Sequence, residues 1–146
     1  MGKVDKRIKY LMGLDTETCN GLVEGDKLDL SQSIVYDIGW VITDKQGRIY
    51  KERSFVIYEV FVAMKDVMTS AYYAEKIPSY WEDIKSGKRK LVRFSTMRKY
   101  FFEDLKEYNC NTIFAHNALF DYRALQNTIR WVYKSKKRFF FPSKSI

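Results

Sequence analysis

Alternating apolar and polar positions predict a strand and a hairpin in the N-terminal part of the chain. The apolar run at residues 10–14 predicts the first strand, and residues 34–43 predict a second strand with one apolar face. Residues 44–47 predict a turn, after which residues 48–58 return as the third strand. Residues 20–31, rich in Gly, Asp and Glu, are expected to form a loop between the first two strands.

Short helices are predicted for the middle of the chain. Apolar spacing predicts a helix at residues 61–68, and Ser70 can cap another helix that must end before Pro78. The sequence Ser79-Tyr80-Trp81-Glu82 matches a capping box, which predicts a helix that Gly87 can close.

Two amphipathic helices with a short buried strand between them are predicted for the C-terminal half. Ser95 is expected to cap the first helix, whose apolar stripe comprises Met97, Tyr100, Phe101, Leu105 and Tyr108. Residues 112–115 predict the strand, and Asn117 is the expected N-cap of the last helix. The residues expected to face inward from that helix are Ala118, Leu119, Tyr122, Leu125, Ile129 and Val132. These elements predict one α/β domain over residues 1–146, with a mixed sheet flanked by helices.

The composition agrees with a folded domain, since 46% of the residues are hydrophobic and 16% are aromatic. No apolar stretch approaches the roughly 20 residues that span a bilayer, and the first residues lack the apolar core of a signal peptide. We therefore expect a cytoplasmic protein without a membrane partner. The compact size and the high Lys and Tyr content would fit a bacterium, or a phage in its host. Only Cys19 and Cys110 are present, too few for a thiolate zinc site, so any metal is expected to be held by oxygen.

The net charge of +8 is concentrated at the C-terminal end. All eighteen acidic residues lie at or before Asp121. The seven cationic residues after it are Arg123, Arg130, Lys134, Lys136, Lys137, Arg138 and Lys144. Such a block suits a polyanion such as nucleic acid, and a solvated helix end is the alternative explanation.

Two carboxylates, Asp15 and Glu17, follow the first predicted strand directly. Side chains two residues apart in an extended segment project from the same face, so this pair can hold a hard divalent cation through its oxygen atoms. Thr16 is expected to point the other way. The two acids could also be ordinary loop residues that close a strand.

Two segments together resemble a known family of nucleases. Leu14-Asp15-Thr16-Glu17-Thr18 after a strand, and the segment at residues 115–125, Ala-His-Asn-Ala-Leu-Phe-Asp-Tyr-Arg-Ala-Leu, about 100 residues later, resemble the first and second motifs of the DEDD-type 3′→5′ exonucleases. That family includes the proofreading subunits and domains of DNA polymerases. The resemblance implies a ribonuclease-H-like mixed sheet, with the first three strands antiparallel and the next one parallel.

The resemblance also implies a two-metal site and a role for each matching residue. Asp15 would bridge two Mg²⁺ or Mn²⁺ ions, Glu17 would bind the ion on the nucleophile side, and Asp121 would reach the ion on the leaving-group side. His116 would have a positioning role. The residues implied to line the pocket of the terminal nucleotide are Thr16, Thr18, Asn117 and Phe120. The residues expected at the nucleic-acid backbone are Arg123, Lys134, Lys136, Lys137 and Arg138.

The family's third motif, with its fourth aspartate and accompanying His or Tyr, has no counterpart here. After Asp121 the chain contains no Asp, Glu or His. The chain is expected to be a truncated member that lacks the last strand and helix, while a natural short form and a site completed by a second subunit are the alternatives. Losing a positioned base typically reduces the rate by a factor of about 10²–10⁴.

Three functions therefore compete. The first is a metal-dependent 3′→5′ exonuclease of reduced activity on single-stranded or frayed DNA ends, although neither motif encodes recognition of the 2′-hydroxyl. The second is a catalytically impaired nucleic-acid-binding module on the same scaffold. The third is a protein-interaction element that uses Phe139, Phe140 and Phe141, which we expect to pack on the sheet or its open edge, or on a partner such as a second copy.

Overall fold

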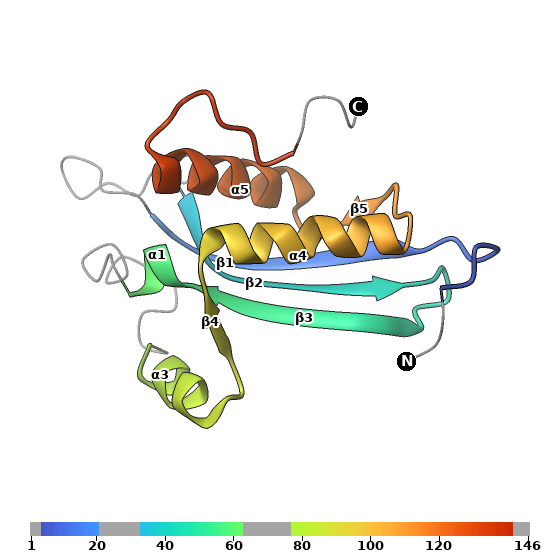
Figure 1. Ribbon diagram of the computed structural model, residues 1–146, viewed down its shortest axis with the longest axis horizontal. Coiled ribbons are helices and arrows are strands. Elements are labelled where there is room, and N and C mark those ends of the chain that lie inside the picture. Colours follow the sequence, from blue (N-terminus) through green and yellow to red (C-terminus); the bar gives the residue numbers. More distant parts are fainter. Residues whose placement is uncertain (1–3, 21–32, 63–76, 142–146) are drawn as a thin grey trace.

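The computed structural model describes residues 4–20, 33–62 and 77–141, whose strands form one mixed sheet (Figure 1). The strand order is β4-β3-β2-β1-β5. The strands are β1 (Leu11–Asn20), β2 (Ser33–Thr43), β3 (Ile49–Ile57), β4 (Lys90–Val92) and β5 (Ile113–Phe114). The described helices are α1 (Tyr58–Phe61), α3 (Ile77–Ser86), α4 (Phe94–Glu107) and α5 (Ala118–Tyr133).

The predicted α/β class and the hairpin are confirmed. Strand β2 is antiparallel to both β1 and β3, and β5 is parallel to β1. Strand β4, which runs parallel to β3 at the other edge, was not predicted. Its three residues fall in a basic stretch without apolar alternation, and their pairing with β3 is a contact that local sequence does not encode.

The first strand is longer than predicted. Strand β1 continues beyond Leu14 as far as Asn20, so Asp15 and Glu17 lie within a strand and not at its end. The prediction was wrong because the antiparallel ladder with β2 supplies hydrogen bonds to this polar stretch, with a register shift between Glu17 and Thr18. Most of the predicted loop at residues 20–31 lies outside the described residues.

The middle helices differ in their starting points from the predictions. Helix α3 begins at Ile77, so Pro78 lies in its first turn, where a missing N–H costs nothing, and Ser79 is not its cap. Gly87, with a φ of 84°, follows the end of the helix as predicted. Helix α1 ends at Phe61 and shares only that residue with the helix expected at residues 61–68, and Val62 follows it as a turn. The rest of that helix and the one expected from Ser70 lie outside the described residues.

Helix α4 begins at Phe94, one residue before the predicted cap Ser95. The backbone N–H of Phe94 donates to Oε1 of Glu59 at 2.8 Å, so a carboxylate from α1 satisfies this helix start. The cap was missed because its partner is 35 residues away in the sequence. From α4, Met97 and Phe101 are fully buried, and Phe101 packs edge-on against Trp40 of β2.

The last helix has the predicted cap but a narrower buried face than expected. Oδ1 of Asn117 accepts a hydrogen bond from the N–H of Phe120 at 3.3 Å. Leu125 and Ile129 are buried, whereas Leu119 is 59% exposed. Tyr122 and Ala118 are also exposed, so these inward assignments were wrong. They lie in the first turns of α5, beside the short β5, where the described sheet extends no further to cover them.

The C-terminal phenylalanines pack on helices and not on the sheet edge. The segment after α5 folds back across α5 (Figure 1), and Phe140 is fully buried against rings of α4 that include Phe94 and Phe101. Two guanidinium nitrogens of Arg98 donate to the Phe140 carbonyl at 2.6 and 3.0 Å. Phe141 stacks on Tyr122, and Phe139 is 56% exposed.

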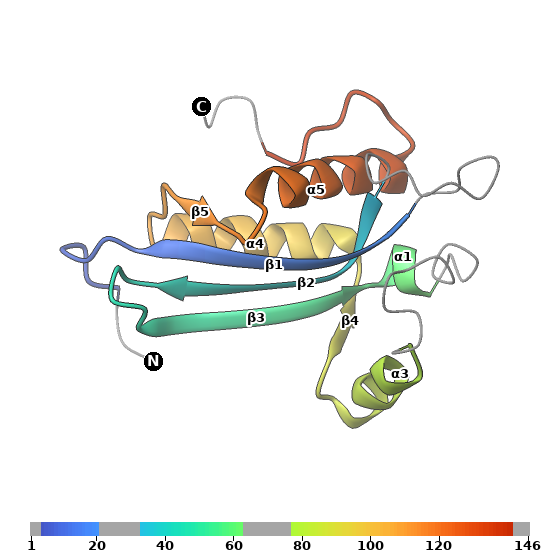
Figure 2. The same cartoon turned by 180° about the vertical axis from the view of Figure 1, so that it is seen from behind.

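Helices α4 and α5 cover one face of the sheet, and no described helix covers β1, β2 and β3 on the other face (Figure 2). The covered face carries the core, which includes Met12, Ile38, Trp40 and Ile42. Gly13 and Asp15 of β1 lie on the uncovered face. Gly39 of β2 lies on the same face, because it pairs with Asp15. None of the described helices is both long and apolar enough to cross a membrane.

Candidate functional site

Asp15 and Glu17 share one face of β1, as predicted. Both line a cavity of about 320 Å³ on the uncovered face of the sheet. Asp15 is exposed and Glu17 is half-buried. The complete lining is Asp15, Glu17, Asp37, Gly39, Ser54, Tyr80 and Arg89. The cavity therefore draws together three carboxylates from two neighbouring strands.

Asp37 is the acidic residue of this cavity that sequence reasoning missed. It pairs with Glu17 across the β1–β2 ladder, so the two side chains lie on the same face. Its Oδ2 accepts a hydrogen bond from the Tyr80 hydroxyl at 2.7 Å and another from Nη1 of Arg89 at 3.2 Å. The available signal was its place on the polar face of the second predicted strand, but its partner on β1 depends on a register that the sequence does not display.

Arg89 is the cation of the cavity, and its position is fixed by three contacts. Besides its hydrogen bond to Asp37, its Nε donates to Oδ2 of Asp83 at 3.0 Å. Its guanidinium also lies 4.0 Å from the centre of the Tyr80 ring, a cation–π contact. A guanidinium held in this way retains donors that can meet a phosphate oxygen.

Burial and neighbouring charge both affect the acidic groups. Burial raises the pKa of Asp37 above its usual value and the charge of Asp15 adds to this, although hydrogen bonding by Tyr80 and the Arg89 charge oppose the rise. Burial also raises the pKa of Tyr80, as does the nearby Asp37 carboxylate. Negative charge is therefore crowded in this cavity, which is an environment that favours a cation.

Asp121 occupies the first turn of α5 and is buried on the other face of β1. Its Oδ1 accepts a hydrogen bond from the Thr16 hydroxyl, so Thr16 points away from the carboxylate cavity as predicted. Burial raises the pKa of Asp121, and Asp15 raises it further, whereas the Thr16 hydrogen bond lowers it. The charge of Asp15 therefore acts on the Asp121 carboxylate across a single strand.

The structure does not bring the three predicted metal ligands to one point. No group of three or more His, Cys, Asp or Glu side chains in the described segments is arranged to hold a metal ion. However, β5 pairs only with Met12 and Gly13, so no strand of the described segments pairs with the adjacent edge of β1 beside Asp15.

The other residues expected at the terminal nucleotide lie around this edge. Thr18 is half-buried just beyond the register shift of β1, and Phe120 is half-buried in the first turn of α5. Asn117 is exposed but its side-chain oxygen is engaged as the helix cap. His116 is exposed and lines a second cavity on the uncovered face.

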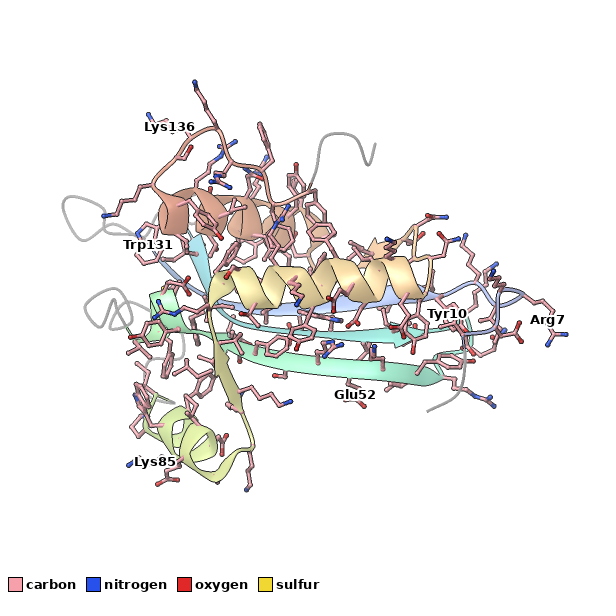
Figure 3. The ribbon with its side chains drawn as sticks, in the orientation of Figure 1. Arg7, Tyr10, Glu52, Lys85, Trp131 and Lys136 are labelled. Atoms are coloured by element: carbon pink, nitrogen blue, oxygen red, sulfur yellow. The ribbon has the colours of Figure 1, made fainter. Side chains whose placement is uncertain are left out.

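The basic tail begins at the end of α5 that is far from the carboxylates. Lys134, in the left-handed conformation with a φ of 51°, ends α5, and Lys136 lies beyond that end of the helix (Figure 3). Thirteen residues separate Lys134 from Asp121, which corresponds to about 20 Å along a helix. Arg123 is exposed nearer to the carboxylates, on the same helix. The tail then returns along α5, because Nε2 of Gln126 donates to the Arg138 carbonyl at 2.6 Å.

The arrangement has a definite chemical capacity. Carboxylate oxygens on one strand face can hold a hard cation, and a fixed guanidinium beside them can bind an anion such as phosphate. Both groups lie in one cavity that is open to solvent on the uncovered sheet face. No protein-family model, curated protein or solved structure matches this chain.

Proposed function

We propose that this chain is a metal-dependent 3′→5′ exonuclease of the DEDD type on a ribonuclease-H-like fold. The observation that carries the proposal is that the second motif lies against the first across β1, with its Asp121 bonded to Thr16 on the opposite face from Asp15 and Glu17. Asp15 and Glu17 share one face, while Asp121 is tied through Thr16 to the residue between them. The antiparallel strands β1, β2 and β3, with β5 parallel to β1, have the directions that the resemblance implies and support the fold assignment.

Asp15 and Glu17 would hold Mg²⁺ or Mn²⁺, because their oxygens share one open cavity and no thiolate is needed for such ions. When bound, two such ions activate a water and stabilise the leaving oxygen of a phosphodiester. Asp121 would approach from its own side of β1, directly or through a water. Arg89 would orient a phosphate oxygen of the terminal nucleotide from the opposite side of the cavity.

A second candidate is a nucleic-acid-binding module without turnover. Two observations favour it: Arg89 already neutralises part of the acidic cavity through Asp37, and Asp121 points toward Thr16 and not toward Glu17. In this case the exposed basic residues of the tail would provide the affinity, which would fall steeply with salt.

Degradation of a labelled oligonucleotide in Mn²⁺ tests the proposal and its polarity. With a 5′ label, the proposed exonuclease produces a ladder that shortens from the 3′ end, and a phosphorothioate at the last 3′ linkage slows the first step. Asp15→Ala should abolish the ladder. An unshortened oligonucleotide that is nevertheless bound would support the module, and equal decay with the wild type and Asp15→Ala would exclude this site as the source of cleavage.

A further inference from the structure

We propose that the uncovered face of β1, β2 and β3 is a groove for single-stranded nucleic acid, with a base stacked on Phe114 and phosphates facing Lys88 and Lys90. The inference rests on the proposed function, and it names the path of the strand that leads to Asp15. It places the strand on the uncovered face of the sheet, whereas the basic tail lies against α5, which covers the other face.

The groove is continuous with the acidic cavity. Its volume is about 680 Å³, and it shares Asp15, Gly39 and Ser54 with the lining of that cavity. Gly39 lies opposite Asp15, and Ser54 lies opposite Gly39, so two small residues lie side by side on β2 and β3 next to Asp15. A row of small side chains across a sheet leaves room for a chain to lie close to the backbone.

Phe114 forms the aromatic side of the groove. Its ring lies directly over Gly13, because a Cβ placed on that glycine would come within 2.7 Å of the ring's Cζ. Any side chain at position 13 would clash with the ring, so this packing requires a glycine there. Phe114 is nevertheless 47% exposed, so part of the ring remains open as a surface on which a base can stack. This exposure contradicts the sequence prediction of a buried strand at residues 112–115.

Lys88 and Lys90 form the cationic side of the groove, next to β4. Both are exposed, and neither forms an ion pair with any residue of the described segments. Arg89 between them differs, because Asp37 and Asp83 hold it. The acidic residues of the groove are Asp15, where it joins the carboxylate cavity, and Glu52. The two lysines can therefore contact phosphates directly. At Asp15 a bound metal ion would lie between the carboxylate and the phosphate backbone of the nucleic acid.

The chemistry of the groove favours single-stranded nucleic acid over a protein partner. On this face the strands contribute Gly13, Asp15, Gly39, Val41, Glu52 and Ser54. Val41 is the only large apolar side chain among these six, whereas the core of a protein interface is largely apolar. An exposed ring on one side and two unpaired cations on the other match the alternation of bases and phosphates in a single strand. The bases of a duplex are already stacked on one another and would not reach Phe114.

Binding of a labelled oligothymidylate of about 12 nucleotides, measured by fluorescence anisotropy in EDTA, tests the groove without requiring cleavage. Lys88→Glu combined with Lys90→Glu should weaken binding about tenfold or more and lower the salt slope by about 1.4. The matched control is Lys99→Glu combined with Lys106→Glu, two exposed lysines of α4 on the covered side, which should change affinity less than about twofold. Phe114→Ala should weaken binding about tenfold, since it removes the stacking surface.

Gly39→Val provides a separate probe that fills the groove without disturbing its sides. A Cβ at Gly39 meets only the Arg53 carbonyl oxygen at 3.4 Å, an ordinary contact, so this variant should fold with an unchanged circular dichroism spectrum. It should weaken oligonucleotide binding to the same extent as Phe114→Ala. A shift of oligomeric state in place of this weakening, seen by sedimentation, would show that a second copy occupies the groove and would overturn the proposal.

Cleavage separates this inference from the proposed function. If the wild type cleaves in Mn²⁺ and both Phe114→Ala and the Lys88 and Lys90 double variant cleave at the same rate, the proposed groove is wrong and the proposed exonuclease stands. If these variants lose binding and the wild type cleaves nothing, the groove remains and the exonuclease is wrong. If the groove double variant and the control double variant weaken oligonucleotide binding equally, the affinity comes only from the overall positive charge. That result would overturn the proposed groove.

Discussion

Asp37 on β2 lies directly opposite Glu17 on β1, so the cavity of the predicted carboxylate pair contains a third acid from a neighbouring strand. The chain after Asp121 contains no acid, and the fourth carboxylate that the nuclease resemblance requires was expected from there. Asp37 lies before Asp121 in the sequence, so it is not the counterpart of that fourth carboxylate. It does contribute negative charge at the place where a cation is proposed to bind.

Asp37→Asn should weaken Mn²⁺ binding by about tenfold, because it removes one charge from the crowded cavity. Isothermal titration with Mn²⁺ provides the measurement. Asp83→Asn is the matched control, since Asp83 also holds Arg89 but does not line the cavity, and it should leave Mn²⁺ affinity nearly unchanged. The same loss of affinity in both variants would show that only the position of Arg89 matters.

Thr16→Val should destabilise the protein by about 1–3 kcal/mol, because it leaves the buried Asp121 carboxylate without its hydroxyl partner. Urea unfolding measures the free energy, and cleavage of an oligonucleotide measures whether Asp121 depends on this contact for its position. Thr16→Ser retains the hydroxyl and should recover most of both quantities. A stable Thr16→Val variant would mean that water replaces the hydroxyl at no cost.

Phe140→Ala should lower the free energy of unfolding by about 3–5 kcal/mol, since it empties a site enclosed by the rings of Phe94 and Phe101. The adjacent Phe139→Ala should cost less than about 0.5 kcal/mol because Phe139 is mostly exposed. Denaturant unfolding of the two variants compares them directly. Similar losses would contradict the placement of the C-terminal segment on α4.

Asp104 joins α4 to the sheet through a buried ionic network. It accepts hydrogen bonds from Nε1 of Trp40 at 2.8 Å, Nε of Arg53 at 2.7 Å and Nζ of Lys51 at 3.2 Å. Burial acts to raise the pKa of Asp104, but these donors outweigh it and hold that pKa below its usual value. The folded state therefore favours the ionised carboxylate more than the unfolded state does.

Asp104→Asn should lower the free energy of unfolding by about 3 kcal/mol at neutral pH, because it removes the buried carboxylate that the partly buried Lys51 and Arg53 share. A depressed folded-state pKa gives stability that is present above the unfolded pKa and is lost as pH falls through the folded value. The difference between wild type and variant should thus shrink below about pH 4. Glu103→Gln, an exposed neighbour on α4, should show no such pH dependence.

The parts of this structure that were predictable are those encoded by neighbouring residues. Strand alternation placed Asp15 and Glu17 on one face, and a local side-chain bond makes Asn117 a helix cap. The cavity could not be completed in this way, because Asp37 enters it through strand register and Tyr80 enters it from a helix 43 residues further along. The sequence likewise did not reveal that the Glu59 carboxylate accepts the first N–H of α4, because the two groups are far apart along the chain.

The central claim is tested most directly by the rate of 3′-end shortening of a 5′-labelled single strand in Mn²⁺. The variants are Asp15→Asn, Glu17→Gln and Asp121→Asn, with Glu103→Gln as a charge-matched control away from the cavity. We predict that the wild type and the control shorten the strand at equal rates, and that each cavity or α5 variant is slower by about 10²-fold or more. Absence of shortening by the wild type, or wild-type rates in all three variants, would contradict the proposed exonuclease.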